Sequence, residues 1–229
     1  MSGLSERKLN LLEAQKKAEA LFRETEQRGL IVADKSEKVL NDEIYELAFQ
    51  MYGIRKYWHK RIVRAGKNTL LPYRENPPDL IIQHDDILFF DFGPVFEDWE
   101  ADFGRTYVIG SDPRKIKLRD DIITTWHEGK EYYEQHKESL TGAQYYSFIR
   151  SLAPKFGWSF GNIHCGHLIG NFPHERIQGD EVNNYLHPDN HIRLAEPDAQ
   201  GNPRDWILEV HFVTPEREFG GFFEQLLSV

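Results

Sequence analysis

Two aspartates, Asp91 and Asp102, lie eleven residues apart in the segment ILFFDFGPVFEDWEADFGRTYVIG. Each follows a run of apolar and aromatic residues that is typical of a buried strand. A carboxylate that is removed from water is strongly destabilising unless it is paired with a positive charge or binds a cation. Because a metal ion can satisfy two neighbouring carboxylates at once, the segment indicates a metal site.

Three further side chains with metal-binding chemistry lie in apolar segments of the last third of the chain, namely His167, Glu209 and Glu224. Four carboxylates and one imidazole form a hard donor set that suits manganese, cobalt, iron or zinc. Their four negative charges can hold two divalent ions, and a carboxylate that bridges both ions would allow them to share a water molecule. The competing interpretation is that these acids form buried ion pairs with Arg105, Arg176 or Arg193.

The composition narrows the class of protein. The chain has 229 residues, of which 40% are hydrophobic, so we expect one soluble domain with a substantial core. A net charge of -9 argues against nucleic-acid binding, and we interpret the basic segment 55–64 as a solvated surface. The charged, helical start does not resemble a signal peptide, and no apolar run is long enough to span a membrane, so we expect a cytoplasmic protein without membrane contact.

Cys165 is the only cysteine, which excludes an internal disulfide and a thiolate-rich zinc site. Any metal must therefore bind to oxygen and imidazole ligands. His164 and His167 flank the thiol, so a nucleophilic cysteine is conceivable. We favour a small buried residue in a strand.

Elements that could position these residues are recognisable from periodicity and end signals. We expect helices over residues 1–29, 36–53, 111–137 and 141–157, with Ser36 as an N-cap and with Gly53 and Gly157 as C-terminal glycines. Residues 86–109 predict an antiparallel hairpin or meander that carries Asp91 and Asp102 on facing strands. Further strands are expected in NIHCGHLIGNF, WILEVHFV and GGFFEQLLSV, and residues 179–204 predict a long polar loop at the rim of a site.

The order of helix, helix, strands occurs twice along the chain. This order suggests two similar halves with a site between them. His164 lies three residues before His167, and alternation along a strand would place these two side chains on opposite faces. His211 lies two residues beyond Glu209 and would share its face, either lining the site or satisfied at the edge of the cavity.

The same residues carry a family resemblance. The motifs FFDFG, ADFGRTY, GHLIG, LEVHF and FFEQLL hold the five candidate ligands in order, and the chain resembles over nearly its whole length the pita-bread-fold metallopeptidases. This family includes methionine aminopeptidase, aminopeptidase P, prolidase and creatinase relatives, and the chain is most similar to the Xaa-Pro aminopeptidase-like branch. The resemblance implies an α+β fold of two pseudo-symmetric halves around a central antiparallel sheet. It further implies one catalytic domain over residues 1–229, with no separate N-terminal domain.

The resemblance also implies roles for individual residues. The five ligands would bind two divalent metal ions, and Glu209 would also take a proton from the nucleophilic water. His174 matches a second family histidine that contacts substrate and stabilises the tetrahedral intermediate, although it could instead cap a loop beside Pro173 and Glu175. Tyr73, in the segment IVRAGKNTLLPYREN, matches a position that contacts substrate.

Two departures from the family pattern bear on the substrate. Pro72 stands where relatives carry a histidine before the tyrosine, so the usual contact with a peptide is missing. His59, His84 and His127 could replace that histidine if the fold brought them to the pocket, but we interpret them as surface or helix histidines. The interval between Glu209 and Glu224 is also short, which leaves Glu216 and Glu218 as rivals for the last ligand. We prefer Glu224 because its setting is strand-like.

Together these features predict a dinuclear metal-dependent hydrolase that cleaves a peptide or related C-N bond of a small substrate, in the manner of an aminopeptidase or Xaa-Pro peptidase. Two alternatives stay open. One is a creatinase-like hydrolase of a non-peptide metabolite, and the other is a binding protein that has lost peptidase activity. The resemblance implies a homodimer.

Overall fold

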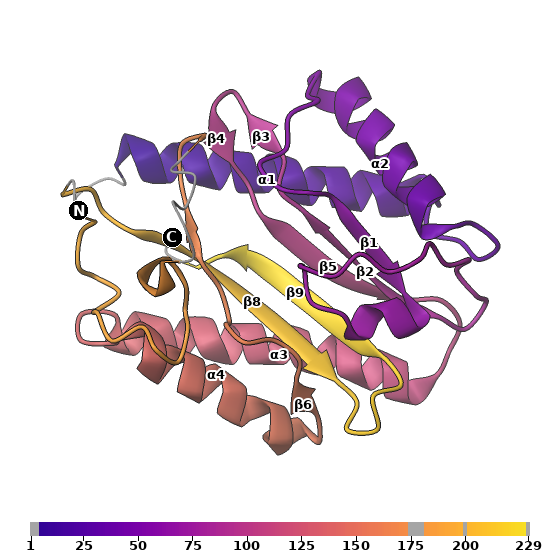
Figure 1. Cartoon of the computed structure of the whole chain (residues 1–229). Coiled ribbons are helices and arrows are strands. Elements are labelled where there is room, and N and C mark those ends of the chain that lie inside the picture. Colours follow the sequence, from indigo (N-terminus) through magenta and orange to yellow (C-terminus); the bar gives the residue numbers. More distant parts are fainter. Residues whose placement is uncertain (1–4, 174–180, 199–200, 228–229) are drawn as a thin grey trace.

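A mostly antiparallel sheet forms the centre of the molecule (Figure 1). The computed structural model describes residues 5–173, 181–198 and 201–227. Neighbouring strands follow the order β1 (Ile62–Ala65), β2 (Ile87–Phe92), β5 (Phe103–Val108), β9 (Gly220–Leu226), β8 (Asp205–Val213) and β6 (Ser159–Phe160). Strand β7 (Leu168–Ile169) also pairs with β8, and β3 (Val95–Phe96) and β4 (Trp99–Glu100) form a separate hairpin.

Within the described ranges, the α-helices that accompany the sheet are α1 (Glu6–Gln27), α2 (Glu37–Tyr52), α3 (Pro113–His136) and α4 (Gly142–Phe156). Two short 3₁₀ helices, η1 (Gly66–Leu70) and η2 (Val182–Asn184), lie in the same described part of the chain. The predicted end signals are confirmed for α2, because the Ser36 hydroxyl accepts a hydrogen bond from the Val39 amide and Gly53 is left-handed with φ 68°. Thr141 and Gln144 form a capping box at the start of α4. No helix among the described residues is long and apolar enough to cross a membrane.

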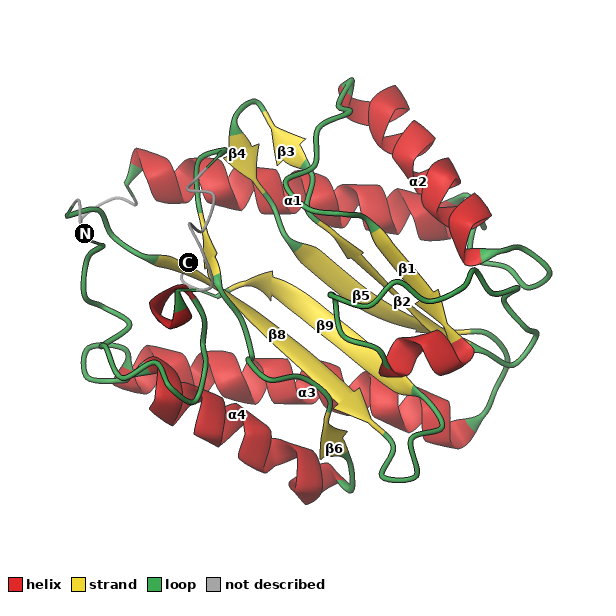
Figure 2. Ribbon diagram, in the orientation of Figure 1, coloured by secondary structure: helices red, strands yellow, loops and turns green. Residues whose placement is uncertain are grey.

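Two halves of similar composition meet in the middle of the sheet. Helices α1 and α2 belong with β1, β2 and β5, whereas α3 and α4 belong with β6, β8 and β9 (Figure 2). The halves join where β5 pairs with β9, with Gly104 opposite Glu224. The predicted α+β architecture and the repeated order of elements are confirmed.

The alternate residues that pack against the helices show which face of the sheet carries the polar groups. On β2, Leu88, Phe90 and Phe92 pack with the apolar sides of α1 and α2. On β8, Leu208, Val210 and Phe212 pack with α3 and α4. Since neighbouring residues of a strand point to opposite faces, Asp91 and Glu209 face away from the helices. The helices therefore cover one face, and the candidate ligands project from the other.

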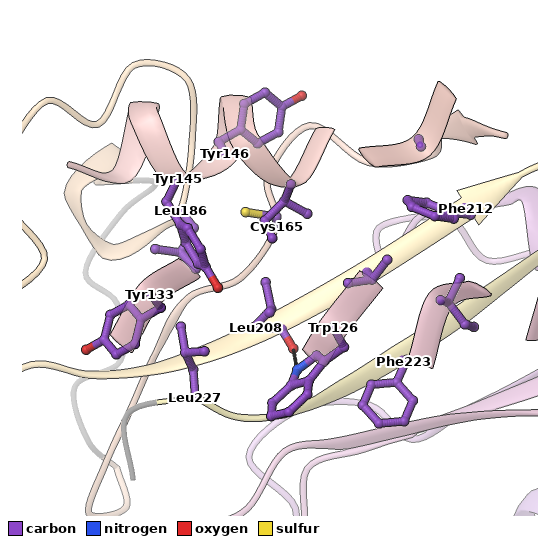
Figure 3. Close-up of a cluster of buried hydrophobic side chains, with 14 of the residues drawn as sticks. Trp126, Tyr133, Tyr145, Tyr146, Cys165, Leu186, Leu208, Phe212, Phe223 and Leu227 are labelled. Atoms are coloured by element: carbon purple, nitrogen blue, oxygen red, sulfur yellow. Dashed lines mark hydrogen bonds between the residues drawn. The ribbon is translucent and has the colours of Figure 1, made fainter. Parts of the chain in front are cut away.

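A hydrophobic core lies between α3, α4 and the β8–β9 pair, separate from the one that α1 and α2 form with β2 (Figure 3). Trp126 crosses it, and its indole Nε1 donates to the Leu208 carbonyl at 3.0 Å. Cys165 is fully buried in this core, and burial raises the pKa of its thiol well above the ordinary value. A buried thiol of high pKa is a poor nucleophile, which leaves the packing role as the interpretation that fits.

One segment differs from its predicted strand. In NIHCGHLIGNF only Leu168 and Ile169 form a strand, and the residues before them bend. Gly166 has φ 149°, and a Cβ there would lie 2.0 Å from the Ile207 carbonyl oxygen. The close approach of this backbone to β8 interrupts the alternation that a regular strand would have.

Candidate metal centre

The five predicted ligands line one pocket of about 380 Å³ on the face of the sheet opposite the helices. Asp91 lies on β2, Asp102 directly before β5, His167 directly before β7, Glu209 on β8 and Glu224 on β9. The register accounts for their proximity, because Asp91 pairs with Gly104, Gly104 with Glu224, and Glu224 with Glu209. Side chains at paired positions of adjacent strands lie on the same face, so the carboxylates of Asp91, Glu209 and Glu224 gather at the junction of the two halves. Asp102, two residues before Gly104, lines the same pocket.

His167 contacts two of these carboxylates. Its Nε2 lies 3.0 Å from Asp102 Oδ2 and 3.6 Å from Glu224 Oε1. Its Nδ1 lies 2.7 Å from the carbonyl oxygen of Leu168, and this bond fixes the orientation of the ring. A metal-binding histidine characteristically donates a hydrogen bond from the N–H of its second ring nitrogen to such an acceptor. Asp102, His167 and Glu224 thus offer one group of potential ligand atoms within 4.8 Å of one another.

A second such group contains a histidine that the sequence did not assign to the pocket. His59, interpreted above as a surface or helix residue, has a side chain that is only 6% exposed, and its Nε2 lies 3.0 Å from Asp102 Oδ1 and 3.5 Å from Asp91 Oδ1. That interpretation is wrong, because residues 56–59 form backbone hydrogen bonds with residues 93–95. The Trp58 amide donates to Gly93, and the Val95 amide donates to Lys56. Gly93, the glycine of FFDFG, accepts the hydrogen bond from Trp58, and apart from this glycine the sequence gives no indication of the pairing.

The position of His164 also differs from the prediction, which placed it on the face opposite His167. It lines the pocket, and its Nδ1 lies 2.9 Å from Glu209 Oε1. The expected opposite orientation assumed a regular strand, whereas the backbone bends between Gly161 and His167. Asn162 donates from Nδ2 to Glu209 Oε2 at 3.2 Å, so both carboxylate oxygens of Glu209 have a partner.

The buried acids and histidines of the pocket shift one another's pKa values. Burial raises the pKa of Asp91 to about 7, and burial together with the nearby Asp102 raises the pKa of Glu224 well above its ordinary value. For Asp102 the effect of burial is outweighed by His59 and His167, which lower its pKa to about 2. Although burial disfavours the imidazolium form, Asp102 and Asp91 raise the pKa of His59 to about 9.

Glu209, unlike Asp91 and Glu224, has a lowered pKa. Burial opposes its ionisation, but His164 outweighs burial and lowers the pKa of Glu209. This carboxylate is therefore ionised at neutral pH and oriented by two neighbours, which are the requirements for accepting a proton from a nearby water molecule.

The remaining predicted residues have mixed outcomes. Tyr73 and Pro72 both line the pocket. His211 is buried outside the pocket lining, and its Nε2 lies 2.8 Å from the Thr69 carbonyl oxygen, so a substrate contact does not follow from its position. His174 lies outside the described residues.

The alternative partners and ligands lie elsewhere. Glu216 and Glu218 are exposed and pair with Arg114, so they do not compete with Glu224 for the pocket. Arg105 donates to the backbone carbonyls of Gly104 and Glu224. Arg193 pairs with Glu196, and Arg176 lies outside the described residues. The competing interpretation, ion pairs of these acids with Arg105 or Arg193, is not what the described residues form, because the acids contact the histidines of the pocket.

These residues fit a divalent cation. Glu224 Oε2 is buried and has no hydrogen-bond partner among the described residues. Burial raises the pKa of Asp91 and Glu224, so the metal-free pocket favours the protonated form of these two carboxyl groups. Metal binding displaces protons from such ligands, and a cation would both neutralise the carboxylates and supply the missing partner.

The fold and pocket define a pita-bread hydrolase-like domain, and comparisons with known proteins agree. The structure superposes on an X-Pro aminopeptidase of Thermotoga maritima with a TM-score of 0.77 and 21% identity, covering 100% of this chain and 62% of the other. A methionine aminopeptidase of Rickettsia prowazekii gives a TM-score of 0.69 at 15% identity, covering 100% of this chain and 96% of that one. These likenesses confirm the predicted fold.

A profile of the metallopeptidase family M24 matches residues 10–204, and the chain belongs to that family. Among curated proteins, an Xaa-Pro dipeptidase of Pyrococcus horikoshii is 27% identical over 131 residues, which are 57% of this chain and 36% of the relative. An uncharacterized peptidase of Methanocaldococcus jannaschii is 29% identical over 173 residues, 72% of this chain and 46% of the relative. The matched region is thus less than half of each relative. The profile match ends before Glu209 and Glu224, so their placement rests on strand register.

Proposed function

We propose that this protein is a hydrolase that binds two divalent metal ions through Asp91, Asp102, His167, Glu209 and Glu224 and cleaves a peptide or related C-N bond. The observation that carries the proposal is the convergence of these five side chains from separate strands on one pocket. Bound divalent ions would lower the pKa of a water molecule and polarise a carbonyl group. Membership of a metallopeptidase family supports this chemistry.

The chain's own residues supply the remaining steps. Glu209 accepts a proton from the attacking water, and His164 and Asn162 hold its two oxygens in place. The proton is then available for the leaving nitrogen. His174, seven residues after His167, is proposed to contact the substrate, as is Tyr73, which lines the pocket.

The pocket suits a small substrate. Its volume of about 380 Å³ lies near the lower end of the range for small-molecule sites. Trp58, Tyr73, Tyr185 and Phe222 add aromatic surface to its lining. A dipeptide or a short peptide with an Xaa-Pro bond, as named for the curated relatives, is the proposed substrate class.

One specific feature supports a second candidate. Pro72 lines the pocket where the sequence resemblance calls for a histidine, so one peptide-binding group is replaced. A hydrolase acting on a non-peptide metabolite with a C-N bond would not need that group. The same five ligands would serve both reactions.

The test is hydrolysis of a panel of dipeptides, Xaa-Pro peptides and cyclic amidines by metal-loaded protein. Asp102→Ala removes the carboxylate that contacts both His59 and His167 and should abolish turnover. His84→Ala alters an exposed histidine and serves as the control. Turnover of peptides supports the first candidate, and turnover of amidines alone supports the second. Turnover that survives in Asp102→Ala contradicts the proposed metal site. Absence of turnover from the whole panel contradicts the proposed hydrolase and leaves a binding protein as the interpretation.

A further inference from the structure

We infer that His59 is a sixth protein ligand, coordinating through Nε2 the metal ion held by Asp91 and Asp102. This inference rests on the proposed metal centre and extends it beyond the five residues that the sequence motifs identify. The reason is a correspondence in detail between His59 and His167, the imidazole that the motifs do identify.

The two histidines have equivalent surroundings. Each Nε2 lies 3.0 Å from a different oxygen of Asp102, with His59 at Oδ1 and His167 at Oδ2. Each also approaches a second carboxylate, because His59 is 3.5 Å from Asp91 and His167 is 3.6 Å from Glu224. The two imidazoles thus flank Asp102 on both sides.

The second nitrogen of each ring is held in the same way. His59 Nδ1 lies 2.7 Å from the carbonyl oxygen of Lys60, and His167 Nδ1 lies 2.7 Å from that of Leu168, in both cases the next residue of the chain. A hydrogen bond from Nδ1 to a backbone carbonyl directs the Nε2 lone pair toward the carboxylates. This arrangement orients histidine ligands in metal sites generally.

The spacing of the donor atoms fits a shared ion. Two neighbouring ligand atoms that each lie about 2.1 Å from an ion are about 3.0 Å apart in octahedral geometry and about 3.4 Å apart in tetrahedral geometry. The distances of 3.0 and 3.5 Å from His59 Nε2 to Asp102 and Asp91 match this spacing. His59, Asp91 and Asp102 together offer ligand atoms within 4.8 Å of one another.

The position of His59 is built into the fold. A Cβ on Gly93 would lie 2.2 Å from His59 Cδ2 and 2.4 Å from Trp58 Nε1, so the ring occupies space that only glycine leaves open. Trp58 Nε1 donates to the Ala101 carbonyl at 3.1 Å, and the Trp58 ring lies 4.4 Å from His59 and 5.3 Å from His167. One tryptophan therefore packs against both imidazoles.

A histidine ligand on each ion would affect which metals the site prefers. An ion bound only by carboxylates and water suits manganese or magnesium, whereas imidazole favours zinc, iron, cobalt and nickel. His59 would therefore shift the preference of the ion beside Asp91 toward this second group. A metal-binding experiment can detect this shift without any substrate.

The test uses cobalt as the probe. Protein stripped with a chelator is titrated with Co²⁺, and binding is followed by visible absorption and equilibrium dialysis for the wild type, His59→Ala and the control His84→Ala. We expect two ions per chain in the wild type and the control. In His59→Ala one ion should bind at least about tenfold more weakly with an altered absorption spectrum, as for loss of an imidazole.

Paramagnetic proton NMR of the cobalt-loaded wild type provides a measurement that does not depend on whether the variant folds. Each coordinated histidine should contribute one exchangeable, strongly shifted Nδ1 proton, so His59 and His167 predict two such signals. One such signal, or two ions bound with unchanged affinity and spectrum in His59→Ala, overturns the role of His59 and leaves the proposed hydrolase intact. A wild type that binds no cobalt overturns both.

Discussion

At the scale of single residues, the orientation of Glu209 can be tested through His164. His164 contacts Glu209 Oε1 at 2.9 Å and does not belong to the predicted ligand set, so it acts as a positioning residue. We expect His164→Ala to lower kcat about 10- to 100-fold, the usual effect of removing a group that orients a metal ligand. KM should change little, because the lost contact orients the proton acceptor and does not bind the substrate.

Steady-state kinetics of metal-loaded His164→Ala, beside His84→Ala as the exposed control, gives this measurement. A rise in KM at unchanged kcat would instead show that His164 binds substrate. His164→Gln keeps a polar group near Glu209 and should recover part of kcat, which a purely structural role would not predict.

The residues themselves show how far sequence could identify the site. The place of Asp91, Asp102, Glu209 and Glu224 in the pocket was predictable because each lies in or next to an apolar strand, where a buried acid needs a partner. His59 and His164 were missed because they lie where the chain is irregular. Periodicity carries no information there, and only tertiary pairing of residues 56–59 with 93–95 brings His59 to the pocket.

At the scale of elements, the packing of α3 on α4 and β8 depends on Gly129. A Cβ there would lie 2.6 Å from Ile149 Cδ1 and 2.8 Å from Leu208 Cδ2. Alanine favours a helix by about 1 kcal/mol relative to glycine, but overpacking a core costs about 1–3 kcal/mol. We therefore expect Gly129→Ala to destabilise the protein in spite of its better helix propensity.

Urea denaturation compares Gly129→Ala with Glu131→Ala, a substitution at an exposed position of the same helix that should change the free energy of unfolding by less than about 0.5 kcal/mol. A Gly129→Ala variant as stable as the wild type would mean that α3 can shift away from the sheet. Such a shift would contradict the close packing described here.

Elements were predictable where local chemistry determines them. Ser36, Gly53 and Gly157 mark helix ends through hydrogen bonds within a few residues, and all three function as expected. The strand expected across NIHCGHLIGNF was not formed over most of its length. Its backbone is determined by close contact with β8, which lies about forty residues further along the chain and leaves no local signal.

At the scale of the whole molecule, the charge of the pocket links metal binding to folding. Burial raises the pKa of Asp91 from its ordinary value of 3.8 to about 7. In the metal-free protein this group therefore contributes its full stability below about pH 4, and the contribution is lost as the pH rises through about 7. The chain carries a net charge of -9, so the buried acids repel one another in a molecule whose overall charge is already negative.

Asp91→Asn should consequently have opposite effects in the two states of the protein. With a chelator at pH 8, the variant should be more stable than the wild type by about 1–4 kcal/mol, because it removes a buried charge without removing volume. The difference should shrink at pH 4, where Asp91 is protonated in the folded chain and, close to its ordinary pKa of 3.8, only partly ionised in the unfolded chain. With excess manganese or cobalt the order should reverse, since an ion that binds only the native state raises Tm more the more tightly it binds, and the variant has lost a ligand. Thermal unfolding at both pH values, with and without metal, measures all four conditions. A wild type whose Tm does not respond to metal, or a variant that is less stable than the wild type in every condition, would contradict a cation-binding role for this cluster of acids.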